Sequence, residues 1–109
     1  MSVSISDSGT QTTSGTTDHT LSTRTTPGTY VLVVDLNSMA IGDIVELSIY
    51  VKPLVGGTSR LAYHASFGPG IPAEPIVFSV PVPITEEMIC KLKKAAGANS
   101  GFPWAVLLL

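Results

Sequence analysis

Charged side chains are scarce in this sequence of 109 residues. They make up 13% of it, whereas soluble domains average about 25%, and the mean hydropathy is positive at +0.39. The formal net charge is −2, and the densest group of basic residues is Lys91, Lys93 and Lys94. Nucleic-acid binding requires a basic patch or stripe, so the composition argues against that function. A surface with so little charge is either rich in Ser, Thr and Gly or covered by a partner, and both interpretations remain open.

Cysteine, long apolar runs and targeting signals are also rare or missing. Cys90 has no second cysteine with which to form an internal disulfide, so nothing indicates an oxidising compartment. Residues 1–14 lack the basic start and the apolar run of a signal peptide. No apolar run approaches the ~18 residues of a membrane span. We expect a protein that is made and kept in a cytoplasm, with no membrane partner.

The residue types of catalytic and metal sites occur here without the spacing that such sites require. His19 or His64 could be combined with Asp35 or Asp43, but no serine lies in a nucleophile elbow. No neighbour in the sequence would activate the thiol of Cys90. The histidines, the cysteine and the acids show no C-x-x-C or H-x-x-x-H spacing. We therefore assign no catalytic residue, no metal site and no cofactor, and we predict that the protein is not an enzyme.

Two consecutive segments, 28–36 and 44–52, alternate apolar and polar residues at period two. This alternation is typical of half-buried antiparallel strands, because successive side chains leave opposite faces of a sheet. The predicted inward positions are Tyr30, Leu32, Val34 and Leu36 in the first segment, and Val45, Leu47, Ile49 and Val51 in the second. The pair therefore predicts a sheet with one face turned to a core.

Further short strands are expected along the rest of the chain. Gly56-Gly57 predicts a hairpin turn, since glycine tolerates the positive φ that such turns need. The expected strands cover residues 16–26 as an edge strand, residues 59–67 with Leu61, Tyr63, Ala65 and Phe67 inward, and residues 76–80 and 102–109. The three final leucines indicate that the last strand is covered in a sheet or an interface, and Trp104 is expected to be a core anchor. Six to eight short strands at roughly ten-residue spacing predict an all-β antiparallel sandwich or jelly roll.

The start of the chain differs in composition from the remainder. Residues 1–15 are rich in Ser, Thr and Gly and have few large apolar groups to offset the entropy of ordering. We expect a flexible N-terminal arm over residues 1–15, which orders on a neighbouring subunit, followed by a single sandwich domain over residues 16–109. Deletion of such an arm would leave the fold intact and weaken attachment to the partner.

Local signals conflict in residues 85–97. An acidic start, a Glu87–Lys91 pair at i,i+4 and late lysines favour a helix. Cys90 and Leu92 instead alternate with polar residues, as in a strand. The sequence leaves both structures open for this segment.

Two short motifs resemble those of small structural proteins of tailed bacteriophages. They are GD-x-VEL at residues 42–47 and FPW-x-V at residues 102–106, within a similarity that covers residues 28–109. In proteins of that type the segment matching 86–94 is a strand, which favours the strand over the helix. The resemblance implies no catalytic residues.

The resemblance implies a place in a virion, on the head surface, after assembly in the host cytoplasm. One role is a capsid decoration (cement) protein that binds the major capsid protein as a homotrimer, where many weak contacts add through avidity. The other role is a tail, neck or baseplate component. A carbohydrate- or receptor-binding β module is a third possibility. It requires an exposed aromatic platform, and Tyr30, Tyr63 and Trp104 are expected to be too buried to form one.

Overall fold

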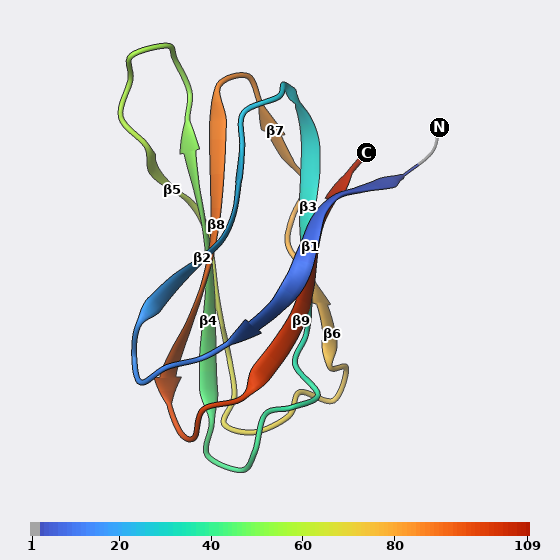
Figure 1. The fold of residues 1–109 in the computed structure, drawn as a ribbon, viewed down its shortest axis with the longest axis vertical. Helices are drawn as coiled ribbons and strands as arrows, with labels where there is room; N and C mark the ends of the chain where they lie inside the picture. Colours follow the sequence, from blue (N-terminus) through green and yellow to red (C-terminus); the bar gives the residue numbers. More distant parts are fainter. Residues whose placement is uncertain (1–2) are drawn as a thin grey trace.

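A computed structural model describes residues 3–109 as two antiparallel β-sheets that pack face to face (Figure 1). Sheet A contains β1 (Ser4–Thr12), β9 (Gly101–Leu108), β3 (Gly28–Asp35), β6 (Ile76–Phe78) and β7 (Val82–Ile84), and sheet B contains β2 (Asp18–Arg24), β8 (Glu87–Ala96), β4 (Ile44–Lys52) and β5 (Arg60–Phe67). The part of the chain that the structure describes contains no helix. The all-β sandwich predicted from the sequence is confirmed.

The chain crosses between the sheets at most of its connections. Sheet A has the order β1-β9-β3-β6, with β7 also beside β3, and sheet B has the order β2-β8-β4-β5. Strands β6 and β7 pair with opposite halves of β3 and together act as one interrupted strand. Counted in that way, the two sheets have four strands each and the connectivity of a jelly roll.

The interruption between β6 and β7 centres on Ser79. The backbone N–H of Ser79 donates to the Leu32 carbonyl at 2.8 Å, and the Leu32 N–H donates to the Ser79 hydroxyl at 2.9 Å. The hydroxyl thus replaces the carbonyl that a regular ladder would supply. Pro81 follows, and its missing N–H prevents a regular continuation of the ladder. Val80 in this interruption is left 54% exposed.

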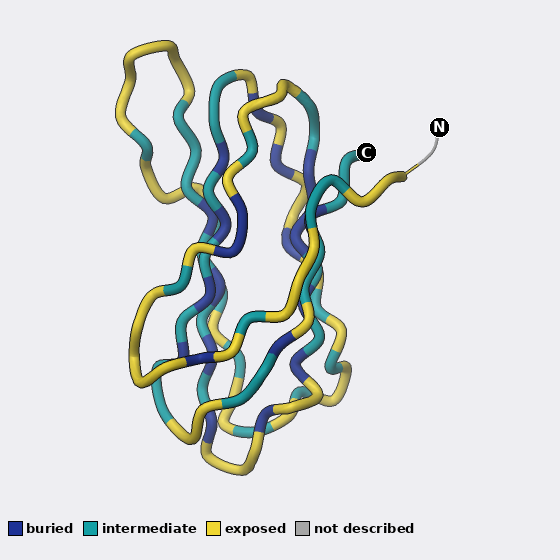
Figure 2. Tube along the Cα trace, in the orientation of Figure 1, coloured by how far each residue is buried: buried dark blue, intermediate teal, exposed yellow. Residues whose placement is uncertain are grey.

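The core fills the space between the sheets and is built from alternate residues of the central strands. Its largest fully buried side chains are Tyr30, Leu32, Val34, Leu36, Val45, Leu47, Ile49, Met88, Leu92, Phe102 and Val106. The inward positions predicted in segments 28–36 and 44–52 all lie in this core or pack against it. Figure 2 shows the buried stretches along the central strands and the exposed stretches mainly in the loops at the two ends.

Residues 87–96 form strand β8, so the strand is confirmed and the helix is wrong. Strand β8 lies between β2 and β4 and pairs with both. Cys90 and Leu92 on its inner face are fully buried. A helix would give up both ladders and this burial, which outweighs the few tenths of a kcal/mol of an i,i+4 pair. Glu87 and Lys91 instead have partners on other strands, at 4.0 Å from Lys52 and 3.7 Å from Asp18 respectively.

The flexible arm predicted over residues 1–15 is wrong for Ser4–Thr12, which form β1. This strand pairs antiparallel with β9, and Gly9 lies opposite Trp104. A Cβ at Gly9 would lie 3.3 Å from the indole ring, so the missing side chain makes room for it. Polar strands such as this one are ordered through their backbone ladder, which composition does not reveal. Met1 and Ser2, at the start of the predicted arm, lie outside the described residues.

Leu61 was expected to face the core and is 53% exposed. The cause is a bulge in the pairing of β5 with β4: Ile49 lies opposite Tyr63, and Tyr50 lies opposite Leu61. The extra residue, Ala62, shifts the alternation of β5 by one position. Tyr63 still packs against the core, whereas Leu61 is placed on the outer face of sheet B. The edge position predicted for residues 16–26 is confirmed by β2.

Asp43 connects three loops at one end of the sandwich and is 2% exposed. Its Oδ2 accepts the N–H of Ala40 at 2.8 Å, and its Oδ1 accepts the N–H of Ala98 at 3.0 Å. Its backbone carbonyl accepts the N–H of Gly70 at 2.9 Å. Gly97, with φ of 103°, has no room for a Cβ beside this carboxylate. The aspartate of the GD-x-VEL motif is therefore a structural requirement of these loops.

Deletion of residues 1–12 should lower the free energy of unfolding. The deletion removes β1, leaves one edge of β9 unpaired and uncovers Trp104. We expect a loss on the order of 3 kcal/mol or more, the scale of uncovering one large aromatic side chain. Urea unfolding followed by the fluorescence of the single tryptophan measures it, with deletion of residues 1–2 as the control. An unchanged unfolding midpoint would show that β1 is dispensable.

Asp43→Ala should destabilise the protein far more than removal of an exposed aspartate. The substitution removes the buried carboxylate that accepts the part-buried N–H groups of Ala40 and Ala98, and a hydrogen bond to a charged group contributes about 1.5–3 kcal/mol. The matched control is Asp18→Ala, because Asp18 lies in an exposed ion pair worth about 0–1 kcal/mol. Equal unfolding midpoints for the two variants in urea would contradict the role given to Asp43.

Candidate functional site

The side chains that the sequence offered for catalysis lie apart in the fold. Cys90 is fully buried in the core. His64 lies on the outer face of sheet B, with its Nε2 3.7 Å from Glu46 Oε1. The Nε2 of His19 accepts the N–H of Ser14 at 3.2 Å. The structure therefore does not bring the thiol and the two imidazoles to one place.

Residues 3–109 contain neither a cluster of metal ligands nor a membrane-spanning helix. No group of three or more His, Cys, Asp or Glu side chains in this range is arranged to hold a metal ion. No helix within the same range is long and apolar enough to cross a membrane.

The three lysines of the densest basic group do not form a stripe. Lys94 is buried, and its Nζ donates to the Gly97 carbonyl at 2.6 Å and to Asn99 Oδ1 at 2.8 Å. Lys91 lies on the opposite face of β8, with its Nζ 5.2 Å from the centroid of the Tyr50 ring. The alternation of the strand thus divides these charges between the interior and one outer face.

Burial raises the pKa of the Cys90 thiol from 9.0 to about 12, and the nearby Arg24 guanidinium offsets only part of this shift. The thiolate is the nucleophilic form of cysteine. Cys90 therefore packs as an apolar residue and is unreactive in the folded protein.

Cys90 should resist thiol reagents in the native protein at pH 8 and react only after unfolding. The same burial gives a pH dependence of stability. The unfolded chain loses the thiol proton near pH 9 and the folded chain near pH 12, so the free energy of unfolding falls as the pH rises through this window. In the Cys90→Ala variant, the free energy of unfolding should lack the part of this decrease that deprotonation of the thiol causes. Rapid labelling of native protein by Ellman's reagent would contradict the burial.

The outer face of sheet B carries charged side chains that pair with one another. Its ion pairs join neighbouring strands and are Lys52–Glu87 at 4.0 Å and Lys91–Asp18 at 3.7 Å, and the imidazole of His64 lies 3.7 Å from the Glu46 carboxylate. Paired charges of this kind keep the face well solvated.

The outer face of sheet A carries a group of apolar side chains beside the polar residues Ser8, Thr10 and Asp35. We call it the apolar face; its members are Ile5, Val31, Val33, Ile76, Phe78, Val80, Pro103, Ala105 and Leu107. Cross-strand register brings them together, because Ile5, Leu107 and Val31 lie in one row. A second row contains Ala105, Val33 and Phe78. No ion pair is found on this face among residues 3–109.

Four side chains contribute most of the exposed apolar area of this face. Ile5 is 66% exposed, Phe78 61%, Val80 54% and Ile76 47%. Ile5 lies on the edge strand β1, and Ile76 and Phe78 lie on β6 at the opposite edge of the sheet; apolar patches of a few hundred Å² on a monomer are often functional. The apolar face is therefore the candidate functional site.

A shallow hollow of about 240 Å³ lies on the apolar face. We call it the sheet-A hollow; it is lined by Val33, Asp35, Ile76, Pro103, Trp104 and Ala105. Asp35 is the one ionisable residue in this lining, and its Oδ1 accepts the N–H of Asn37 at 2.9 Å. The second carboxylate oxygen of Asp35 has no hydrogen bond within residues 3–109. The site is thus an apolar depression with one negative charge at its border.

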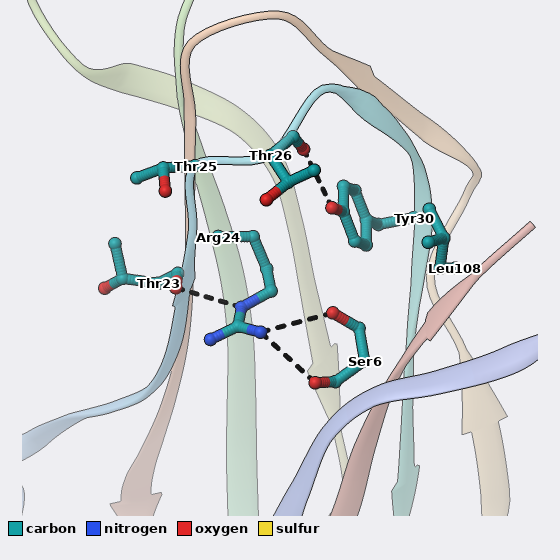
Figure 3. Close-up of a pocket in the computed structure, with 7 residues that line it drawn as sticks. All are labelled: Ser6, Thr23, Arg24, Thr25, Thr26, Tyr30 and Leu108. Atoms are coloured by element: carbon teal, nitrogen blue, oxygen red, sulfur yellow. Dashed lines mark hydrogen bonds between the residues drawn. The ribbon is translucent and has the colours of Figure 1, made fainter.

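A second hollow, of about 280 Å³, lies where the open edge of the sandwich brings β2 close to β1 (Figure 3). The Nε of Arg24 donates to the Thr23 carbonyl at 2.9 Å, and its Nη1 donates to the carbonyl and the hydroxyl of Ser6, each at 3.2 Å. Its Nη2 lies 3.7 Å from Asp7 Oδ2. The Tyr30 hydroxyl donates to the Thr26 carbonyl at 2.8 Å. Arg24 is thus engaged in joining the two sheets, which makes this hollow structural.

The sequence contains a second signal, besides the alternation of apolar and polar residues, that points to the apolar face. Strands β3 and β9 include the unbroken apolar runs 30–34 and 105–108. Such runs are typical of strands that are covered on both faces. Phe78 and Val80 gave no comparable signal, because their placement depends on how β6 pairs with β3. Trp104 packs against the core, as predicted, and also borders the sheet-A hollow.

Comparison with known proteins gives a fold and no family. No family model and no curated protein matches the chain. The structure of infectious bursal disease virus Gx strain matches 98% of this chain and 31% of that chain, with a TM-score of 0.52 and 15% identity. The VP2 subviral particle of infectious bursal disease virus matches 97% of this chain and 30% of that chain, with a TM-score of 0.50 and 12% identity. This chain spans less than a third of the length of those chains, and at such identities the likeness shows a shared fold.

Proposed function

We propose that the protein is a non-enzymatic structural component of a virion. The observation that carries this proposal is the difference between the two outer faces of the sandwich. The outer face of sheet B carries ion pairs between neighbouring strands, whereas the apolar face of sheet A exposes large side chains such as Phe78 and Ile5. Exposed apolar area of this extent is stabilised by contact with another protein surface. A protein with such a surface is suited to assembly.

The fold supports the same proposal. Jelly rolls occur in viral capsid proteins, lectins and cupins, so the fold alone leaves several functions open. Two of the solved structures with similar folds are those of a virus and of a subviral particle. The motifs at residues 42–47 and 102–106 independently resemble small bacteriophage structural proteins.

We further propose a capsid decoration (cement) protein, which binds the major capsid protein on the head surface as a homotrimer after assembly in the host cytoplasm. A clamp of this kind needs broad, weakly charged contact surfaces whose contributions add through avidity, and the apolar face supplies one. A tail, neck or baseplate position is the alternative, since the same face could serve a contact there. Neither nucleic acid nor membrane is proposed as a partner.

A carbohydrate- or receptor-binding module is less consistent with the structure. Sugar binding of the aromatic-platform type needs exposed rings, and Tyr30 is only 1% exposed. Tyr63 and Trp104 are half-buried and pack against the core. The exposed aromatic ring of Phe78 belongs to the apolar face, where it lies beside aliphatic side chains.

The decoration proposal predicts a trimer that binds expanded head shells more tightly than unexpanded precursor shells. Phe78→Glu should weaken shell binding or trimer formation, because it places a charge in the apolar face. The matched control is Leu61→Glu, a similarly exposed apolar residue on the outer face of sheet B. Cosedimentation with empty shells and light scattering measure the two properties.

A monomeric protein that ignores shells and copurifies with tails would contradict the decoration role. Equal loss of shell binding in the Phe78 and Leu61 variants would show that the apolar face has no special part in it.

A further inference from the structure

A second exposed apolar feature lies far from the apolar face. The loop between β4 and β5, residues 53–59, which we call the β4–β5 tip, exposes Leu54 by 71% and Val55 by 85%. Figure 1 shows this loop projecting beyond one end of sheet B, whereas β6, which borders the sheet-A hollow, lies toward the other end on the opposite sheet. The tip of one chain therefore cannot occupy the hollow of the same chain.

The β4–β5 tip has a defined shape. The N–H of Gly57 donates to the Leu54 carbonyl at 2.9 Å, which closes a four-residue turn. Gly56 has a φ of 73° at the third position of this turn, as type II turns require. Leu54 and Val55 are thus displayed on a closed turn, and little conformational entropy is lost when such a turn binds.

The sheet-A hollow suits the tip in size and in chemistry. A dry cavity of about 150 Å³ can hold a benzene ring, so a hollow of about 240 Å³ can accept side chains such as leucine and valine. Its lining is apolar except for Asp35. The two surfaces therefore match as an apolar projection and an apolar depression.

The charges beside the two surfaces have opposite signs. Lys52 and Arg60 flank the β4–β5 tip in the sequence, at the end of β4 and the start of β5. Arg60 is exposed and forms no ion pair within residues 3–109. Asp35 borders the hollow and retains one free carboxylate oxygen. Docking of the tip would bring a basic group toward this carboxylate, which favours a second copy of this chain as the occupant.

We propose that the β4–β5 tip of one copy docks in the sheet-A hollow of a second copy. The contact joins two different surfaces, so it is heterologous, and repetition of it closes a ring when the rotation between copies allows closure. Three such contacts complete the homotrimer, so the inference rests on the oligomer proposed above. It assigns the interface of that oligomer to Leu54 and Val55 on one copy and to the lining around Ile76 on the next.

Two variants and one control test the interface. The tip variant combines Leu54→Asp with Val55→Asp, and the hollow variant is Ile76→Asp. The control is Leu61→Asp, because Leu61 is 53% exposed and Ile76 is 47% exposed. Sedimentation velocity should show trimers for the wild type and the control and monomers for the tip and hollow variants, with unchanged circular dichroism in all four.

Mixing the two defective variants distinguishes this contact from a symmetric one. Each tip-variant molecule retains an intact hollow, and each hollow-variant molecule retains an intact tip. The mixture should therefore form a 1:1 pair joined by one contact, without trimers. In a second test, Asp35→Arg should weaken the trimer, and addition of Arg60→Asp on the same chain should restore it.

A monomeric wild type, or a tip variant that remains trimeric, would overturn the proposed interface. Failure of the two defective variants to pair would do so as well. The proposed function is tested separately by shell binding. A monomeric wild type that binds shells would contradict the interface alone, and a trimer with the predicted variant behaviour that ignores shells and copurifies with tails would contradict the decoration role alone.

Discussion

The stacking of the two sheets on one apolar core is the constraint on which the rest of the structure depends. Every second residue of β3 and β4 is committed to this core, as Leu32 and Ile49 show. The same constraint makes a strand of residues 87–96, because Cys90 must face inward between the sheets. Asp43 then holds the loops at one end in a fixed relation to these strands.

The core leaves the outward side chains free to serve other purposes, and the two sheets differ in how they use them. Sheet B places ion pairs there, such as Lys52 with Glu87, which keep that face in water. Sheet A places large apolar groups there, such as Phe78. The β4–β5 tip adds a second exposed apolar surface at a distant point. A protein with two such surfaces and a low overall charge is suited to repeated contact with other protein surfaces.

Much of this fold is predictable from the sequence, because alternation at period two reports directly on burial. The inward faces of 28–36 and 44–52 and the all-β class follow from it. Features that depend on the pairing of strands far apart in the sequence cannot be predicted from this alternation. Leu61 is exposed because of a bulge against β4, and residues 4–12 are ordered because β9 offers them an edge. The apolar face required the register of β6 on β3, which no local pattern reveals.

We propose that contact is made through the apolar face and not through the outer face of sheet B. Hydroxyl-radical footprinting of side chains, in the dilute free chain and in the assembled form, distinguishes the two faces. Phe78 and Ile76 should become protected on assembly, while Tyr50 and Leu61 keep their reactivity. Protection of Tyr50 and Leu61, with Phe78 and Ile76 unchanged, would contradict it.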